Sequence, residues 1–232
     1  ADPFYISEET KAALHEAYKY WKGKTNFDLA SSYMSKEAHT AIEHNMFTPG
    51  NYFYNGIGHV TVHYDWILES GLDGIVEKAK KAKEALSFEM PDYIKRTQFL
   101  DAVIESCEAA ELYAARYASL ALSLAEKEPD RKRRDELLVI AANCARVPKS
   151  GARNFYEACQ SFWFIQMLLQ VESSGHSISP GRFDQYMYPY FKKDLDTGKI
   201  SYAAAQELMD CIWVKLNDLN KVRDAASAEG FA

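Results

Sequence analysis

The sequence predicts a predominantly helical fold with a few strands. Over several long segments, apolar residues recur every three to four positions, which is the period of an amphipathic helix. Residues 47–64 instead contain proline and glycine and end in HVTVHY, where apolar and polar residues alternate as in a strand. Residues 171–186 form a second irregular stretch, rich in small polar residues. The 232 residues can bury one sizeable core, so we expect a single domain.

Helical periodicity is strong in five segments, namely residues 7–23, 92–126, 135–146, 154–172 and 201–223. Ser7 is a suitable N-cap for the first segment, and Gly23 follows its end. Each segment presents apolar residues on one side. In the first they are Leu14, Ala17, Tyr18 and Trp21; in the second Leu100, Val103, Cys107, Ala110, Ala114 and Tyr117; in the last Leu208, Cys211, Ile212, Leu216 and Leu219.

The alternating stretch predicts a short strand with two different faces. One face carries Val60, Val62 and Tyr64, and the other carries His59, Thr61 and His63. Four residues along a strand span about 13 Å, so His59 and His63 are too far apart to share a metal ion. The sequence has no other pattern typical of a metal site, and we expect none.

The second irregular stretch directly follows one of the most apolar runs of the chain, which we expect to be buried: Phe162, Trp163, Phe164, Ile165, Met167, Leu168 and Leu169. The polar residues after it are therefore expected to face the interior of the protein. His176 and Ser177 are open to three interpretations: a nucleophile with its base, a turn, or a pair that binds a polar ligand. The first is the weakest, because no G-x-S-x-G motif surrounds Ser177. We also expect Arg182 and Asp184 to form an ion pair at a helix start.

Charge and cysteine usage exclude several classes of protein. The net charge is -6 with both signs interspersed, which predicts no nucleic-acid partner and no attraction to anionic membranes. The basic run at residues 131–134 lies at a helix start and is typical of a solvated face. The four cysteines follow no metal or disulfide pattern, so we expect reduced core residues of a cytoplasmic protein: Cys107, Cys144, Cys159 and Cys211.

Two stretches of the sequence, GNYFYNGIGHVTVHYDWILESGLDGI and ESSGHSISPGRFDQYMYPYFKKDL, resemble glycyl radical enzymes of the pyruvate formate-lyase superfamily. The flanking stretches FYEACQSFWFIQMLL and QELMDCIWVKLNDLNKVRD extend the resemblance over essentially the whole chain. Within the superfamily, the chain is most similar to the B12-independent glycerol and propane-1,2-diol dehydratases. The resemblance implies an α/β fold, with residues 1–232 forming a predominantly helical portion of a ten-stranded α/β barrel.

The resemblance also assigns roles to four residues. His59 matches a histidine that contacts the departing hydroxyl group, and His176 and Ser177 match residues that hold the diol. Asn51 falls at a cavity position where choline lyases carry tyrosine and hydroxyproline dehydratases an aromatic residue. The combination of Asn51, His59 and Ser177 therefore favours a small polyol as substrate.

The radical chemistry of these enzymes requires a Gly-Cys-Val-Glu-like loop and an Arg-Val-x-Gly-Tyr-like loop, and neither occurs in the sequence. We therefore expect an internal fragment that binds no cofactor and is inactive alone. The complete enzyme would carry a glycyl radical installed by a radical-SAM activating enzyme and would form a homodimer. Two alternatives remain: another activity of the superfamily, such as formate acetyltransfer or choline cleavage, and a non-catalytic helical binding module.

Overall fold

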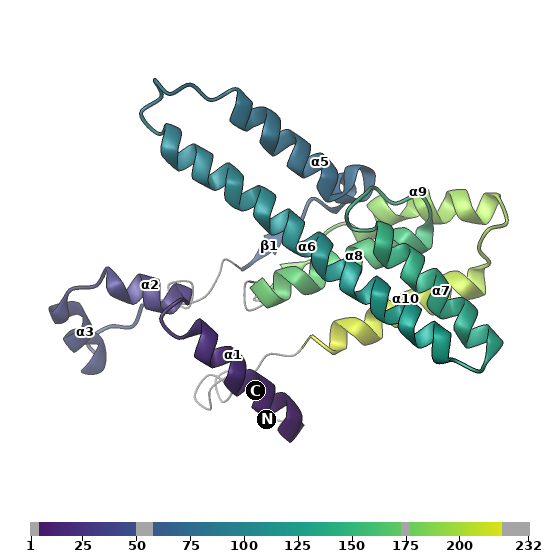
Figure 1. The fold of residues 1–232 in the computed structure, drawn as a ribbon, viewed down its shortest axis with the longest axis horizontal. Helices are drawn as coiled ribbons and strands as arrows, with labels where there is room; N and C mark the ends of the chain where they lie inside the picture. Colours follow the sequence, from purple (N-terminus) through teal and green to yellow (C-terminus); the bar gives the residue numbers. More distant parts are fainter. Residues whose placement is uncertain (1–4, 50–57, 173–176, 220–232) are drawn as a thin grey trace. The chain divides into compact units, whose positions relative to one another are not determined.

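The computed structural model describes residues 5–49, 58–172 and 177–219, and most of these residues are helical (Figure 1). The prediction of a predominantly helical fold with a few strands is confirmed. The elements in chain order are α1 (Glu8–Trp21), α2 (Asn26–Ser32), α3 (Lys36–Glu43), β1 (Val60–Thr61), α5 (Tyr64–Glu84), α6 (Tyr93–Lys127), α7 (Arg131–Arg146), α8 (Phe155–Glu172), β2 (Ile178–Ser179), α9 (Phe183–Asp196) and α10 (Tyr202–Asn217).

The predicted helices begin where side chains can cap them. The Ser7 hydroxyl accepts a hydrogen bond from the Thr10 amide at 3.1 Å, as predicted for α1. Ser201 caps α10 in the same way. Asp130 caps α7, so that α7 begins at Arg131, four residues before the predicted start at residue 135. Helix α10 ends at Asn217, six residues earlier than the periodicity predicts, although part of the difference lies outside the described residues.

The chain divides into two compact units. The first comprises residues 1–60, 170–177 and 220–232, and the second comprises residues 61–169 and 178–219. The first unit contains α1, α2 and α3, none of which has a buried residue. Tyr18 and Trp21 on the apolar face of α1 are 54% and 52% exposed. Periodicity thus predicts this helix correctly, but it does not identify a neighbour that covers its apolar face.

The core of the second unit forms around α5, α8 and α9. Tyr64, Leu68 and Phe162 are completely buried there. The ring centroids of Tyr64 and Phe162 are 4.8 Å apart, and those of Phe162 and Phe183 are 5.0 Å apart in an edge-to-face arrangement. The predicted burial of the apolar run in α8 is confirmed, because every one of its apolar side chains is buried or half-buried.

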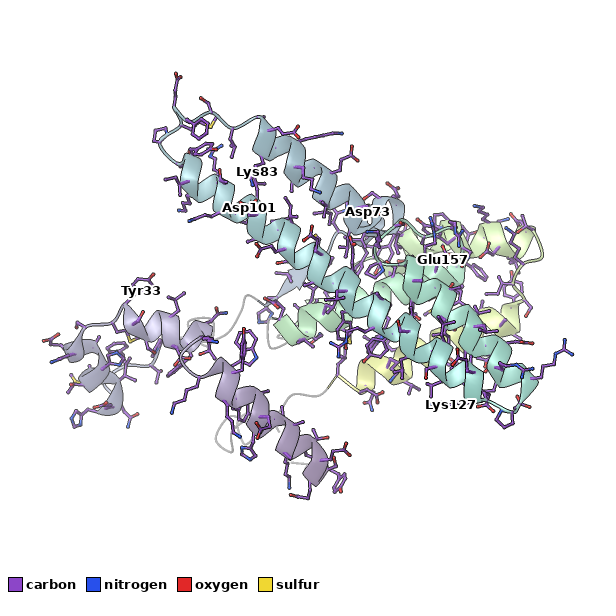
Figure 2. The ribbon with its side chains drawn as sticks, viewed as in Figure 1. Tyr33, Asp73, Lys83, Asp101, Lys127 and Glu157 are labelled. Atoms are coloured by element: carbon purple, nitrogen blue, oxygen red, sulfur yellow. The ribbon has the colours of Figure 1, made fainter. Side chains whose placement is uncertain are left out.

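Helix α6 packs between α5 and α7. Figure 1 shows α5 and α7 lying along different parts of this long helix. Near its start, Asp101 pairs with Lys83 of α5 at 2.5 Å, and Figure 2 shows the two side chains facing each other. Farther along, small buried residues allow α7 to approach: Ala114, Ala118, Ala121 and Ala125. Cys107 and Ala114 of the predicted stripe are buried as expected, whereas Tyr117 at its end is 43% exposed.

Three of the four cysteines occupy the core, as predicted. Burial raises the pKa of the Cys159 thiol to about 12 and that of the Cys144 thiol to about 11, so both are neutral at ordinary pH. The prediction was wrong for Cys211, which is exposed. On α10 the buried side is centred on the next residue, Ile212. Cys211 points away from that side, because consecutive residues of a helix point about 100° apart.

Helix α5 is interrupted at Gly71, and the interruption holds the connection between α7 and α8. Gly71 has a φ of 67°, which frees the amides that follow it. The Leu72 and Asp73 amides donate to the carbonyls of Pro148 and Lys149, each at 2.9 Å. A Cβ atom on Gly71 would lie 2.2 Å from the Lys149 carbonyl oxygen, so only glycine allows the two backbones to approach this closely.

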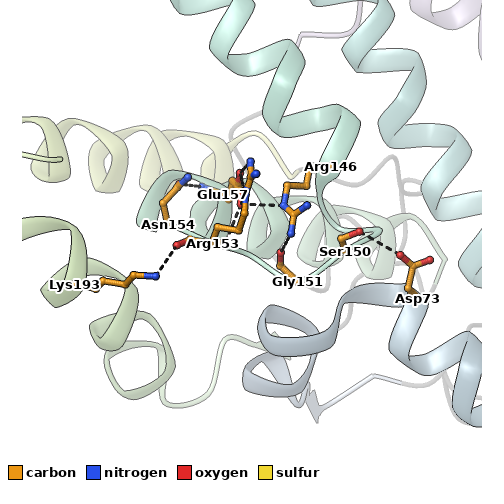
Figure 3. Close-up of polar contacts among 8 residues, drawn as sticks. All are labelled: Asp73, Arg146, Ser150, Gly151, Arg153, Asn154, Glu157 and Lys193. Atoms are coloured by element: carbon orange, nitrogen blue, oxygen red, sulfur yellow. Dashed lines mark hydrogen bonds and ion pairs between the residues drawn. The ribbon is translucent and has the colours of Figure 1, made fainter. Parts of the chain in front are cut away.

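A buried carboxylate completes this junction at the start of α8. Glu157 is 1% exposed and pairs with Arg153 at 2.5 Å and with Arg146 at 3.4 Å (Figure 3). The Arg153 amide also donates to this carboxylate, at 2.8 Å. Burial raises the pKa of Glu157, but the hydrogen bonds and charges of the two arginines outweigh burial and leave this pKa below its usual value.

No helix in the described ranges is long and apolar enough to cross a membrane.

We expect Glu157→Gln to destabilise the protein by about 1–3 kcal/mol at pH 7, because the charged partner of two arginines is lost from a buried site. A carboxylate whose pKa is lowered by folding stabilises the protein above its unfolded-state pKa, and this stabilisation disappears as the pH falls through the folded-state pKa. The difference between wild type and variant should therefore shrink below about pH 4.5. Urea unfolding measured across this pH range provides the test.

Glu77→Gln is the matched control, because Glu77 pairs with Lys81 on the exposed surface of α5. We expect it to cost clearly less stability than Glu157→Gln, because solvent screens an exposed ion pair. An equal loss for the two variants at pH 7, or a Glu157→Gln loss that persists unchanged at low pH, would contradict the assigned role.

Candidate functional site

The two irregular stretches of the sequence meet in a small sheet. Strands β1 and β2 pair with each other, although 116 positions separate Thr61 from Ser177. Strand β1 begins directly after His59, and β2 begins directly after Ser177. The predicted strand is confirmed but short, since Tyr64 already starts α5. Its alternation persists: Val60 and Val62 are half-buried, Tyr64 is buried, and the histidines and threonine between them are exposed.

His59 and Ser177 share an uncommon backbone conformation. Their φ angles are 54° and 56°, and Asn45 is the only other non-glycine residue with positive φ in the described chain. The left-handed region costs a residue with a side chain roughly 1–2 kcal/mol. Such residues persist only where the surrounding structure holds them, and they are frequent at binding and active sites. Two predicted site residues therefore carry backbone strain at equivalent places, each immediately before a strand.

Tyr64 anchors the segment that follows β1. Its side chain is fully buried, and its hydroxyl donates a hydrogen bond to the side-chain oxygen of Gln166 on α8. Its ring lies 4.8 Å from that of Phe162 and 5.4 Å from that of Tyr186. Burial raises the pKa of Tyr64 far above its usual value, so its hydroxyl keeps its proton and remains a donor.

Gln166 connects this anchor to the second strand. The residue is 2% exposed, and its side-chain nitrogen donates to the carbonyl of Ile178 in β2 at 2.9 Å. Sequence reasoning did not identify Gln166 or Tyr64 as site residues. The available signal was that Gln166 is the one polar side chain in the apolar run 162–169, where a buried amide requires hydrogen-bond partners.

The chain after β2 is held close to β1. The Tyr186 hydroxyl donates to the Pro180 carbonyl at 2.7 Å. Gly181 has a φ of 66°, and a Cβ atom there would lie 2.6 Å from the methyl group of Thr61. The expected ion pair between Arg182 and Asp184 does not form; Asp184 accepts a hydrogen bond from Gln185 instead, at 2.8 Å.

An open cavity of about 610 Å³ lies beyond the ends of the two strands, between the start of α5 and α9. His63 lines it and forms a hydrogen bond with Asp65, another lining residue. Arg182 and Tyr190 line the side formed by α9. In the parts of the chain that the structure describes, no group of three or more metal-ligating side chains comes together.

Half of the predicted site residues can be placed. His59 and Ser177 are exposed and precede the two paired strands. The expectation that the polar residues after the apolar run face the interior is therefore wrong for Ser177 and Ser179, which are both exposed in this chain. Asn51 and His176 lie outside the described residues. The structure therefore brings together the segments that carry His59 and Ser177, and the binding roles of all four residues stay predictions.

Comparison with known proteins supplies a family. The pyruvate formate lyase-like family matches residues 1–232. A solved structure concerned with 1,2-propanediol dehydration in Roseburia inulinivorans is 62% identical, with a TM-score of 0.86 over 100% of this chain and 28% of that one. The glycerol-bound B12-independent glycerol dehydratase from Clostridium butyricum is 52% identical, with a TM-score of 0.82 over 97% of this chain and 28% of that one.

Among characterised sequences, the (2S)-3-sulfopropanediol dehydratase of Klebsiella oxytoca is 37% identical over 96% of this chain. The match covers 27% of that enzyme. The chain thus spans little more than a quarter of the length of these relatives.

The contact between Gly181 and Thr61 leads to a testable prediction about the strand pair. We expect Gly181→Ala to cost more stability than Gly198→Ala, because both glycines have positive φ but nothing lies within 4 Å of the new methyl group at Gly198. In a Thr61→Ser background, which lacks the obstructing methyl, the extra cost should disappear, giving a coupling of about 0.5–3 kcal/mol. Thermal unfolding of the single and double variants measures it; additive effects would show that the two positions are independent.

Proposed function

The chain belongs to the pyruvate formate lyase-like family, and on this premise we propose that it is the substrate-binding part of a glycyl radical enzyme that dehydrates glycerol or propane-1,2-diol. The observation that carries the proposal is the 62% identity, over the whole chain, to the structure concerned with 1,2-propanediol dehydration. The 52% identity to the glycerol-bound dehydratase supports the same class of substrate. In this proposal, residues 1–232 are part of one domain built as a ten-stranded α/β barrel.

His59 is proposed to contact the hydroxyl group that leaves as water. An imidazole in this position donates a proton or a strong hydrogen bond to the departing oxygen, which lowers the barrier for breaking the C–O bond. Its exposure and left-handed backbone support this role, because both are typical of a side chain directed at a ligand rather than at the core.

Ser177, His176 and Asn51 are proposed to hold the diol. Hydroxyl groups of a substrate need directional hydrogen-bond partners, because an unpaired polar group in a closed cavity costs about 1–3 kcal/mol. A serine hydroxyl both donates and accepts, which suits a substrate hydroxyl that does the same. The pairing of β1 with β2 supports a joint role, since it links the segments on which His59 and Ser177 lie.

In the complete enzyme, a glycyl radical installed by a radical-SAM activating enzyme would supply hydrogen-atom abstraction from the substrate through a cysteine thiyl. The sequence of this chain contains neither the glycine loop nor the cysteine loop. His59 and Ser177 are exposed and fit the substrate side of such a reaction, whereas three of the four cysteines, Cys107, Cys144 and Cys159, are buried and the fourth, Cys211, lies on α10. We further propose that the complete enzyme is a cytoplasmic homodimer.

A different diol is the second candidate substrate. The 37% identity to (2S)-3-sulfopropanediol dehydratase favours the same elimination on a sulfonated diol. The complete protein, activated anaerobically, should be assayed with glycerol, propane-1,2-diol, 3-sulfopropanediol and choline. Aldehyde formation from glycerol or propane-1,2-diol supports the proposal. Turnover of another compound alone would reassign the substrate, and no turnover of any would favour a non-catalytic role.

We expect His59→Asn in the complete, activated enzyme to lower kcat by about 100-fold or more, because general acid assistance contributes rate factors of this size. Asparagine tolerates the left-handed region, so the backbone at this position should be retained. His15→Asn serves as the control, since His15 is also an exposed histidine but lies on α1 and not beside either strand in the sequence. Steady-state kinetics with propane-1,2-diol, together with the melting temperature, measure both. Normal turnover by His59→Asn would show that the assigned role is wrong.

A further inference from the structure

We infer that Gln166 is the residue that positions His59 and Ser177 relative to one another, an inference that rests on the proposed function. Gln166 lies within α8, is 2% exposed, and uses both ends of its amide. Its oxygen accepts from the Tyr64 hydroxyl, and its nitrogen donates to the Ile178 carbonyl. The amide thus joins the chain just after β1 to β2 itself.

Each end of this connection lies close in sequence to a proposed substrate-binding residue. Ile178 is covalently bonded to Ser177, so a hydrogen bond to its carbonyl fixes the residue that directly follows the serine. Tyr64 is the fifth residue after His59, and strand β1 forms the first two residues of the interval between them. Few torsion angles therefore separate the connected atoms from the two side chains, and a displacement of Gln166 would reach both.

The required chemistry explains why an amide stands at position 166. The Tyr64 phenol, whose pKa burial raises, offers a proton and needs an acceptor. The Ile178 carbonyl needs a donor. Glutamine supplies one acceptor and two N–H donors, whereas an aliphatic side chain supplies neither and an ionised carboxylate supplies only acceptors. A single buried side chain thus satisfies two partners that lie far apart in the sequence, because 102 positions separate Tyr64 from Gln166.

The strained backbones of His59 and Ser177 are the reason why the hydrogen bonds of Gln166 would affect substrate binding as well as stability. Left-handed φ angles at His59 and Ser177 are retained only if the neighbouring chain prevents relaxation to ordinary angles. The hydrogen bonds of Gln166 act on that neighbouring chain. Without them the protein can keep its fold while the imidazole and the hydroxyl lose their common orientation, and a misplacement near 1 Å can cost about 100-fold in rate.

The test uses the complete protein with Gln166→Met, which approximates the length of the side chain but removes both hydrogen bonds, and Tyr64→Phe, which removes one. We expect the KM for propane-1,2-diol to rise by about 10-fold or more in each, with unchanged glycyl radical content by electron paramagnetic resonance. Because both variants break the same connection, their effects on KM should be less than additive in the double variant.

Asn154→Ala is the matched control. Asn154 accepts from the Glu157 amide at 2.8 Å at the opposite end of α8, so its loss weakens the same helix without touching Gln166. A purely structural effect lowers the melting temperature and the fraction of active enzyme but leaves KM unchanged, as expected for Asn154→Ala.

Wild-type turnover with an unchanged KM in both Gln166→Met and Tyr64→Phe would overturn the positioning role while leaving the proposed function intact. The positioning role would also be overturned if the KM of Asn154→Ala rose as much as the KM of Gln166→Met and Tyr64→Phe. Wild-type protein that acquires the radical but neither binds nor dehydrates a diol would overturn the proposed function, and the inference with it.

Discussion

The hydrogen-bond chain from Tyr64 through Gln166 to Ile178 is the constraint on which the core of the second unit depends. Its three members come from the start of α5, the middle of α8 and strand β2. Tyr64, Gln166 and Ile178 are all buried, so each polar group must find its partner inside the protein. Because every partner lies on a different element, satisfying these groups fixes the three elements together, and the aromatic rings around Tyr64 pack in the same place.

Helix α8 carries Gln166 in its second half and a buried ion-pair cluster near its start. Near its start, Glu157 binds two arginines, and the carboxylate of Asp194 on α9 accepts from the Phe155 amide at 2.7 Å. Between these polar contacts its apolar residues fill the core of the second unit. Burial supplies most of the stabilisation. The polar contacts add direction, because hydrogen bonds have preferred angles and apolar contacts have none.

The proposed binding residues His59 and Ser177 directly precede the two paired strands. A residue that binds a ligand must expose its side chain while its backbone stays in place. His59 and Ser177 meet both conditions, because their side chains are exposed and the strands that follow them are paired. The two hydrogen bonds of Gln166 hold Tyr64, which follows β1, and Ile178, which follows Ser177.

The sequence by itself indicated α1, α6, α7, α8 and α10, the cap at Ser7 and the alternating faces of β1, because these features depend on contacts within a few residues. It did not indicate α2, α3 or α5. Ser7 and Ser201 cap the predicted helix starts, and the polar break near Ser177 follows a buried run as expected. The family resemblance, confirmed over the whole chain, identified His59 and Ser177 as candidate site residues. The apolar pattern placed Cys211 on the buried side of its helix, but Cys211 is exposed. An error of one residue is enough, because neighbouring residues on a helix can lie on opposite sides of the boundary between buried and exposed faces.

Only the tertiary structure decided how the two irregular stretches are connected. No local pattern predicts that β1 pairs with β2, that Gly71 interrupts α5 to receive the chain at Lys149, or that Gln166 bonds to Tyr64. Each of these contacts joins residues separated by many tens of positions. The physical reason is that a local pattern shows which face of a segment is apolar, whereas the partner of a buried polar group is set by which distant segment the folded core brings beside it.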